Sequence, residues 1–252
     1  MKYYFLASYL PEIQKDDLKI KFTVGDLIEE RFHIPGGDWQ DIEKVLLGRD
    51  ILILEKLLLG KTVSLEQSLF DIEFWRDQIK SPKEGPEFLL DFLRGTDLQG
   101  FGARDVDRLY AAYYDYVLST TSHDFLRGYF SFQKDLRNVL AALRAREKRL
   151  APSEYLIGEG DLVNVLGTST AEDFGLTAEY PWLERLMATK QPHQRQDVID
   201  GIIWEYLDEN VGPDPFDFRA ILAYLLKLEI LQKRLALSDE KGMEKVLRLG
   251  GL

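Results

Sequence analysis

The stretch that decides the fold runs from Asp124 to Leu150 and reads DFLRGYFSFQKDLRNVLAALRAREKRL. Its apolar residues recur at alternating steps of three and four, a spacing that places them on one face of a helix. These apolar positions are Phe125, Tyr129, Phe132, Leu136, Val139, Leu140 and Leu143. The stretch therefore predicts a long amphipathic helix, either continuous or interrupted near Gly128.

Upstream residues predict a second helix from Val106 to Val117 with the same spacing. Ser119–Ser122 joins it to the first, and its hydroxyl groups can cap the helix that follows. The two helices are expected to form a helical hairpin. Further helices are predicted at residues 41–59, 64–79, 197–209 and 216–237. The last of these is apolar almost all round between Ile221 and Leu231, which is typical of a central, buried helix.

Strand signals are confined to Tyr3–Leu10 and Leu18–Val24, which leave open a small N-terminal β-hairpin. Helical signals dominate, so the sequence predicts an all-α fold made of helical bundle modules. Turn-rich stretches divide the chain into an N-terminal helical region (1–80), a helical hairpin (81–150) and a C-terminal helical module (151–252). One compact unit also fits these signals.

The composition excludes several classes of protein. The chain has no Cys among its 252 residues, which removes disulfides and thiol catalysis and suits a reducing compartment. Its net charge of −11 argues against a general nucleic-acid binder, because such proteins neutralise phosphates with Lys and Arg. No apolar run is long enough for a membrane span. We therefore expect a cytoplasmic protein that meets a membrane only through partners.

Motifs that carry chemistry are missing as well. The sequence contains no phosphate-binding glycine loop and no G-x-S-x-G nucleophile motif. The histidines, His33, His123 and His193, are far apart. His123 and Asp124 resemble a metal-binding His-Asp pair, but that chemistry needs further ligands on neighbouring helices. No catalytic, cofactor-binding or metal-binding residue is assigned, and no cofactor is expected.

A motif within the long helix carries a family resemblance. It reads D-x-x-N-x-x-x-x-L-R-A-R and consists of Asp135, Asn138, Leu143, Arg144, Ala145 and Arg146. It resembles the helix signature of the C-type subunit of V/A-type rotary ATPases, called subunit d in eukaryotes. A second match is Tyr224 and Glu229 within A-Y-L…E, similar to the last helix of that family. The Asn-Leu-Arg that usually follows reads Lys233-Arg234-Leu235 here.

The resemblance implies a non-catalytic coupling subunit in a short bacterial form. Such subunits are arranged as helical modules, rest on the membrane rotor ring of c-type subunits and receive the base of the central shaft. They transmit torque between ion transport and ATP hydrolysis or synthesis. The implied location is cytoplasmic and peripheral to the inner membrane. The alternatives are an unrelated helical adaptor or, from His123 and Asp124, a metal-dependent phosphohydrolase.

Residues 137–149 are rich in Arg and Lys and contain a single Glu. Cations are favoured at the C-terminal end of a helix, so this run needs no partner to explain it. The same run also suits an acidic partner, and its candidate contact residues are Arg137, Arg144, Lys148 and Arg149. Asp135 and Asn138 are expected to brace helix packing, with Arg144 or Arg146 as charge partners.

Overall fold

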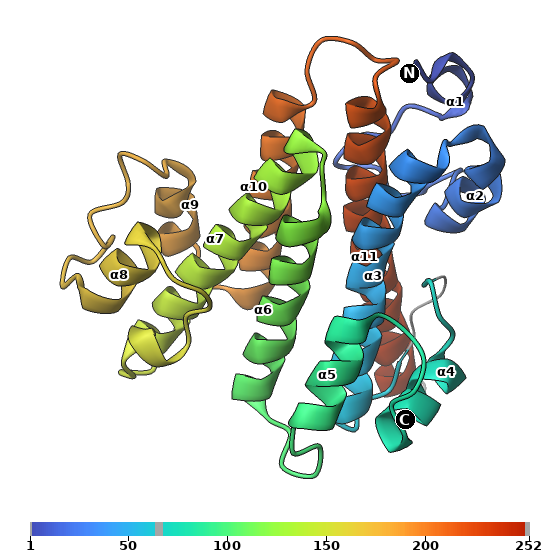
Figure 1. Cartoon of the computed structure of the whole chain (residues 1–252). Coiled ribbons are helices and arrows are strands. Elements are labelled where there is room, and N and C mark those ends of the chain that lie inside the picture. The colour runs from blue at the N-terminus through green and yellow to red at the C-terminus, as the bar shows by residue number, and fades with distance from the viewer. Residues whose placement is uncertain (1, 64–67, 250–252) are drawn as a thin grey trace. The chain divides into compact units, whose positions relative to one another are not determined.

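Every regular element in the described part of the chain is a helix (Figure 1). The computed structural model describes residues 2–63 and 68–249, except for the side chains of residues 192, 193 and 237–249. The α-helices are α1 (Tyr4–Tyr9), α2 (Val24–Glu29), α3 (Gly36–Leu58), α4 (Ile72–Lys80), α5 (Glu87–Gly95), α6 (Ala103–Thr120), α7 (Asp124–Glu147), α8 (Asp161–Thr168), α9 (Trp182–Ala188), α10 (Pro192–Asn210) and α11 (Phe218–Leu249), and the 3-10 helices are η1 (Glu30–His33) and η2 (Pro152–Glu154). The predicted all-α fold class is confirmed.

The N-terminal β-hairpin does not form in the described residues. Tyr4–Tyr9 is helical, and residues 18–23 have no regular structure. Tertiary contacts explain the difference, because the Tyr3 amide donates a hydrogen bond to the Phe216 carbonyl oxygen at 2.7 Å and Leu6 is buried. Packing of this kind overrides the β propensity of a short aromatic run.

The chain divides into two compact units. The first unit combines residues 1–39 and 193–252, and the second contains residues 40–192. The breaks predicted after residues 80 and 150 both lie inside the second unit. Turn residues mark where a chain bends locally, but they do not show which distant segments pack together, so the pairing of the two ends in one unit was not visible in the sequence.

The first unit is built around α11. Between Ile221 and Leu231 this helix buries most of its apolar side chains, in agreement with its all-round apolar sequence. Helices α1 and α2 pack against it. The start of α2 is fixed by a capping box, in which Thr23 and Asp26 each accept a hydrogen bond from the backbone amide of the other.

The second unit contains the predicted helical hairpin, in which α6 and α7 pack side by side (Figure 1). Helix α7 runs through Gly128 without a break, and α3 runs through Gly48. A Cβ atom on Gly48 would lie only 2.9 Å from the Tyr113 hydroxyl oxygen. That hydroxyl donates a hydrogen bond to the Lys44 carbonyl oxygen at 2.8 Å. A side chain at position 48 would have to displace the Tyr113 hydroxyl, so glycine suits the close approach of α6 to α3.

Residues 150–188 fold into a small appendage of α7 that contains η2, α8 and α9. We call it the α8–α9 module. Elements η2 and α8 pack against each other and against α7. None of the helices within the described ranges is both long and apolar enough to cross a membrane.

Candidate functional site

Two side chains of α7 form a clamp that holds the α8–α9 module. The first is Asn138, which is only 1% exposed. Its Nδ2 donates a hydrogen bond to the Ile157 carbonyl oxygen at 3.0 Å, and its Oδ1 accepts one from the Ile157 amide at 2.8 Å. A carboxamide carries both a donor and an acceptor, so one side chain satisfies both buried backbone groups of Ile157. Each would cost about 1–3 kcal/mol if left unpaired.

Arg146, about two turns further along α7, is the second half of the clamp. Its guanidinium group donates hydrogen bonds to the carbonyl oxygens of Ser169, Ala171 and Glu172. The guanidinium carbon also lies 3.5 Å from the centre of the Phe174 ring. The planar, multi-donor shape of arginine suits this combination of hydrogen bonding and stacking, which a lysine does not reproduce.

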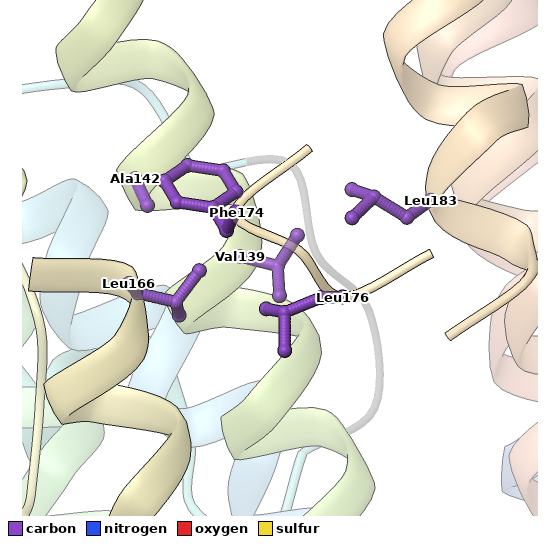
Figure 2. Close-up of a cluster of buried hydrophobic side chains, with 6 residues drawn as sticks. All are labelled: Val139, Ala142, Leu166, Phe174, Leu176 and Leu183. Carbon is purple, nitrogen blue, oxygen red and sulfur yellow. The ribbon is translucent and has the colours of Figure 1, made fainter. Parts of the chain in front are cut away.

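An apolar cluster connects the same elements. Figure 2 shows its buried side chains, which are Val139 and Ala142 from α7, Leu166 from α8, Phe174 and Leu176 from the connecting segment and Leu183 from α9. Leu143 packs against this cluster. Three positions of the motif, Asn138, Leu143 and Arg146, thus serve one purpose, which is to attach the α8–α9 module to α7.

Asp135 lies outside the clamp. It is half-buried and makes no hydrogen bond to a described residue. Burial raises the pKa of its carboxyl group, and Glu179 adds to the increase while Lys134 opposes it. The expected pairing with Arg144 or Arg146 is not formed, because Arg144 is exposed and Arg146 binds backbone carbonyl groups.

Arg137 interacts with side chains of α6 inside the second unit. Its guanidinium donates a hydrogen bond to Asp107 Oδ1 at 2.8 Å and lies 4.0 Å from the centre of the Tyr110 ring. The Tyr110 hydroxyl in turn donates to Glu55 at 2.9 Å, and burial raises the pKa of Tyr110. Of the four candidate partner-contact residues, Arg137 is thus the least available for a partner.

The other three, Arg144, Lys148 and Arg149, are exposed at the C-terminal end of α7. None of them forms an ion pair with a described residue. They are followed by Leu150, which is 44% exposed. The basic run therefore separates into an inward part, Arg137 and Arg146, and an outward part at the helix end.

The second match to the family lies on α11, in the first unit. Tyr224 is half-buried, with its ring 6.2 Å from that of Phe22, and Glu229 is half-buried as well. The Tyr224 hydroxyl oxygen is buried and has no hydrogen-bond partner among the described residues. Burial raises the pKa of Tyr224 to about 12. These residues contribute to packing around α11.

Asp50, in the middle of α3, is a polar site that the sequence interpretation missed. It is completely buried, and it accepts hydrogen bonds from the Leu69 amide (3.1 Å), the Phe70 amide (3.1 Å) and the Trp75 indole Nε1 (2.8 Å). Burial raises the pKa of Asp50 to about 6, although these hydrogen bonds act in the opposite direction. The available signal was its position inside the apolar run VLLGRDILIL.

Among the residues that it describes, the structure brings no further metal ligands to His123 and Asp124, which the phosphohydrolase alternative needs. The Asp124 side chain is exposed and forms an ion pair with Arg127 at 3.0 Å. Within residues 2–63 and 68–249, no three His, Cys, Asp or Glu side chains are grouped to hold a metal ion. His193, the third histidine, has a side chain outside the described part.

Comparisons with known proteins place the chain in one family. A family model described as "Protein of unknown function (DUF2764)" matches residues 1–249. The chain is similar to an uncharacterised protein of Chlamydia muridarum (strain MoPn / Nigg), with 24% identity over 262 residues, covering 97% of this chain and 96% of the relative. No solved structure matches the chain.

Proposed function

The chain belongs to the DUF2764 family, and we propose that it is a non-catalytic coupling subunit of a V/A-type rotary ATPase. In this role it binds the rotor ring of c-type subunits on one side and the central shaft on the other. It transmits torque between ion transport and ATP hydrolysis or synthesis. Its place is on the cytoplasmic side of the inner membrane, and its contact with the membrane is made through its partners.

The clamp on α7 is the observation that supports this proposal most. Asn138 and Arg146 belong to the motif that resembles the C-type subunit, and each makes contacts that few other residue types can make. Their partners are backbone groups of the α8–α9 module, so these two residues serve as parts of a structural frame. A helical frame that keeps its modules in place suits a part that transmits force.

A helical adaptor of another assembly is the second candidate, and one observation is compatible with it. Among the described residues, most of the large apolar side chains that remain exposed lie near the N-terminus. Tyr4, Phe5, Tyr9 and Phe32 are 61%, 55%, 52% and 95% exposed. Exposed apolar groups gathered in one region are typical of protein interaction sites. This surface suits either function and does not choose between them.

Co-purification distinguishes the two candidates. We expect the tagged full-length chain, expressed in its own organism, to recover shaft or ring subunits of the rotary ATPase at moderate ionic strength. An adaptor of another assembly recovers neither. If the intact ATPase also assembles without this chain, the proposed function is wrong.

Two variants of α7 provide a matched pair for the same experiment. Asn138→Ala removes both hydrogen bonds to Ile157 and is expected to reduce recovery by loosening the α8–α9 module. Asp135→Asn changes a half-buried carboxylate without a hydrogen bond on the same helix, and it is expected to recover the subunits as the unmodified chain does.

A further inference from the structure

We infer that the C-terminal end of α7 is a docking surface for an acidic segment of a protein partner. This surface consists of Arg144, Lys148, Arg149 and Leu150, and we call it the basic cap. The inference rests on the proposed function, since it identifies the surface that binds an acidic region of the shaft or of the ring.

The backbone at the end of α7 has a conformation that normally uses glycine. The Leu150 amide donates a hydrogen bond to the Ala145 carbonyl oxygen at 2.8 Å, and the Arg149 amide donates one to the Arg146 carbonyl oxygen at 2.9 Å. This pair of hydrogen bonds is the Schellman motif, whose left-handed residue is usually Gly. Here that residue is Arg149, with a φ of 58°. A side chain in this conformation is disfavoured because its Cβ crowds the following carbonyl group.

The end of α3, in the same unit, offers an internal comparison. The Lys61 amide donates to the Lys56 carbonyl oxygen at 2.8 Å, and the Gly60 amide donates to the Leu57 carbonyl oxygen at 3.0 Å. The left-handed residue is Gly60, with a φ of 66°. The two helix ends share one geometry, and only α7 carries a side chain at the strained position. Strain of this kind is concentrated at positions where the side chain has a task.

The cations of the basic cap have no ion-pair partner among the residues whose side chains the structure describes. Arg144 and Lys148 are four residues apart and so lie on the same face of α7. Together with Arg149 they are exposed and form no ion pair with a described residue. At the other end of the same helix, Arg127 pairs with Asp124. The helix dipole favours cations at the C-terminal end, but it does not require an arginine in a left-handed conformation.

Leu150 adds an apolar contact beside these cations. In the Schellman motif the residue at this position commonly packs against the preceding turn of the helix. Leu150 remains 44% exposed. Three cations next to one exposed leucine match an acidic protein segment that also presents an apolar side chain.

The net charge of the chain helps to identify the class of partner that suits the basic cap. The net charge of −11 disfavours the approach of other anions, and an exposed group of cations such as the basic cap can orient an acidic partner. Anionic lipid surfaces are usually recognised by clusters of about 4–8 Lys or Arg. Nucleic-acid-binding domains are usually basic overall. An acidic protein surface is therefore the favoured occupant.

The test uses the full-length chain and the purified shaft and ring subunits of the rotary ATPase from the same organism. Binding is measured by titration calorimetry at low and moderate salt. Arg149→Gly relieves the strained backbone and removes one charge, so we expect a melting temperature about 2–4 °C higher together with binding about 2–5-fold weaker. Arg144→Glu combined with Lys148→Glu is expected to weaken binding by about 30-fold or more, because like charges then face each other.

Two further measurements complete the design. Lys61→Glu reverses an exposed charge at the end of α3, where the backbone has the same geometry, and it should bind as the unmodified chain does. Vesicles of phosphatidylserine and phosphatidylcholine serve as the lipid probe, and we expect no binding to them. Three results together support the inference. The double variant of Arg144 and Lys148 loses most of its subunit binding, Arg149→Gly binds more weakly but melts at a higher temperature, and Lys61→Glu binds as the unmodified chain does.

The results that would contradict the docking surface differ from those that would contradict the proposed function. If the unmodified chain binds a rotor subunit and the cap variants bind equally well, the basic cap is not the docking surface and the proposed function still stands. If the unmodified chain binds neither subunit, both the inference and the proposed function fail. Vesicle binding that disappears in the cap variants assigns the cap to lipid. A melting temperature of Arg149→Gly that does not rise contradicts the argument from strain.

Discussion

At the scale of the residue, Asn138 has the clearest structural role. Asn138→Leu leaves the buried amide and carbonyl groups of Ile157 without partners, so we expect the free energy of unfolding to fall by about 1–3 kcal/mol. Urea denaturation followed by tryptophan fluorescence measures this loss. Asp135→Asn is the control, because it replaces a half-buried carboxylate whose pKa is raised by burial, and little change is expected there. Equal effects of the two substitutions contradict the clamp.

Asp50 makes the stability of the second unit dependent on pH. Its pKa is about 6 in the folded chain, against an ordinary value of 3.8, so the folded chain holds the proton more tightly than the unfolded chain. The stability contributed by this difference is fully present below pH 3.8 and is lost as the pH rises through about 6. We expect a loss of about 2–3 kcal/mol relative to Asp50→Asn between about pH 4 and about pH 7. A pH-independent difference between the two proteins contradicts the raised pKa.

At the scale of the element, we expect α7 to hold the α8–α9 module through Arg146. Arg146→Ala frees the carbonyl groups of Ser169, Ala171 and Glu172, and we expect faster hydrogen exchange in residues 157–176 with little change in α6. Arg144→Ala, two positions away but exposed, is the matched control and should leave exchange unchanged. Uniformly faster exchange throughout the second unit would instead indicate that Arg146 stabilises the hairpin as a whole.

Some of the helices could be predicted from the sequence and others could not. Helical patterns predicted α3, α6, α7, α10 and α11, because burying one face of a long helix leaves a regular pattern in the chain. Of the helix predicted at residues 64–79, residues 72–79 belong to α4, residues 68–71 are not helical, and residues 64–67 lie outside the described part of the chain. Short helices such as α8 and α9 were missed, since they are held by contacts with α7 and carry few repeats of the pattern. The clamp was anticipated only as polar bracing by Asp135 and Asn138, and of these two only Asn138 belongs to it. The contact with Ile157 depends on how the chain folds back onto α7, and no pattern in the sequence around Ile157 indicates it.

At the scale of the whole molecule, we expect the net charge and its distribution to govern binding to the proposed partner. The acidic composition was evident from the sequence, and so was the basic run at residues 137–149. The sequence did not separate Arg137 and Arg146, which bind inside the second unit, from the exposed residues of the basic cap. That separation depends on which side of α7 each residue faces once α6 and the α8–α9 module are packed.

Coupling between ATP hydrolysis and ion transport is the property that the proposed function assigns to this chain. The most direct measurement compares both rates in membranes from cells with and without its gene. We predict that deletion leaves ATP hydrolysis by the catalytic head in place and abolishes the ion transport that depends on it. Expression of the unmodified chain is expected to restore transport. Ion transport that remains coupled to ATP hydrolysis after deletion would contradict the account.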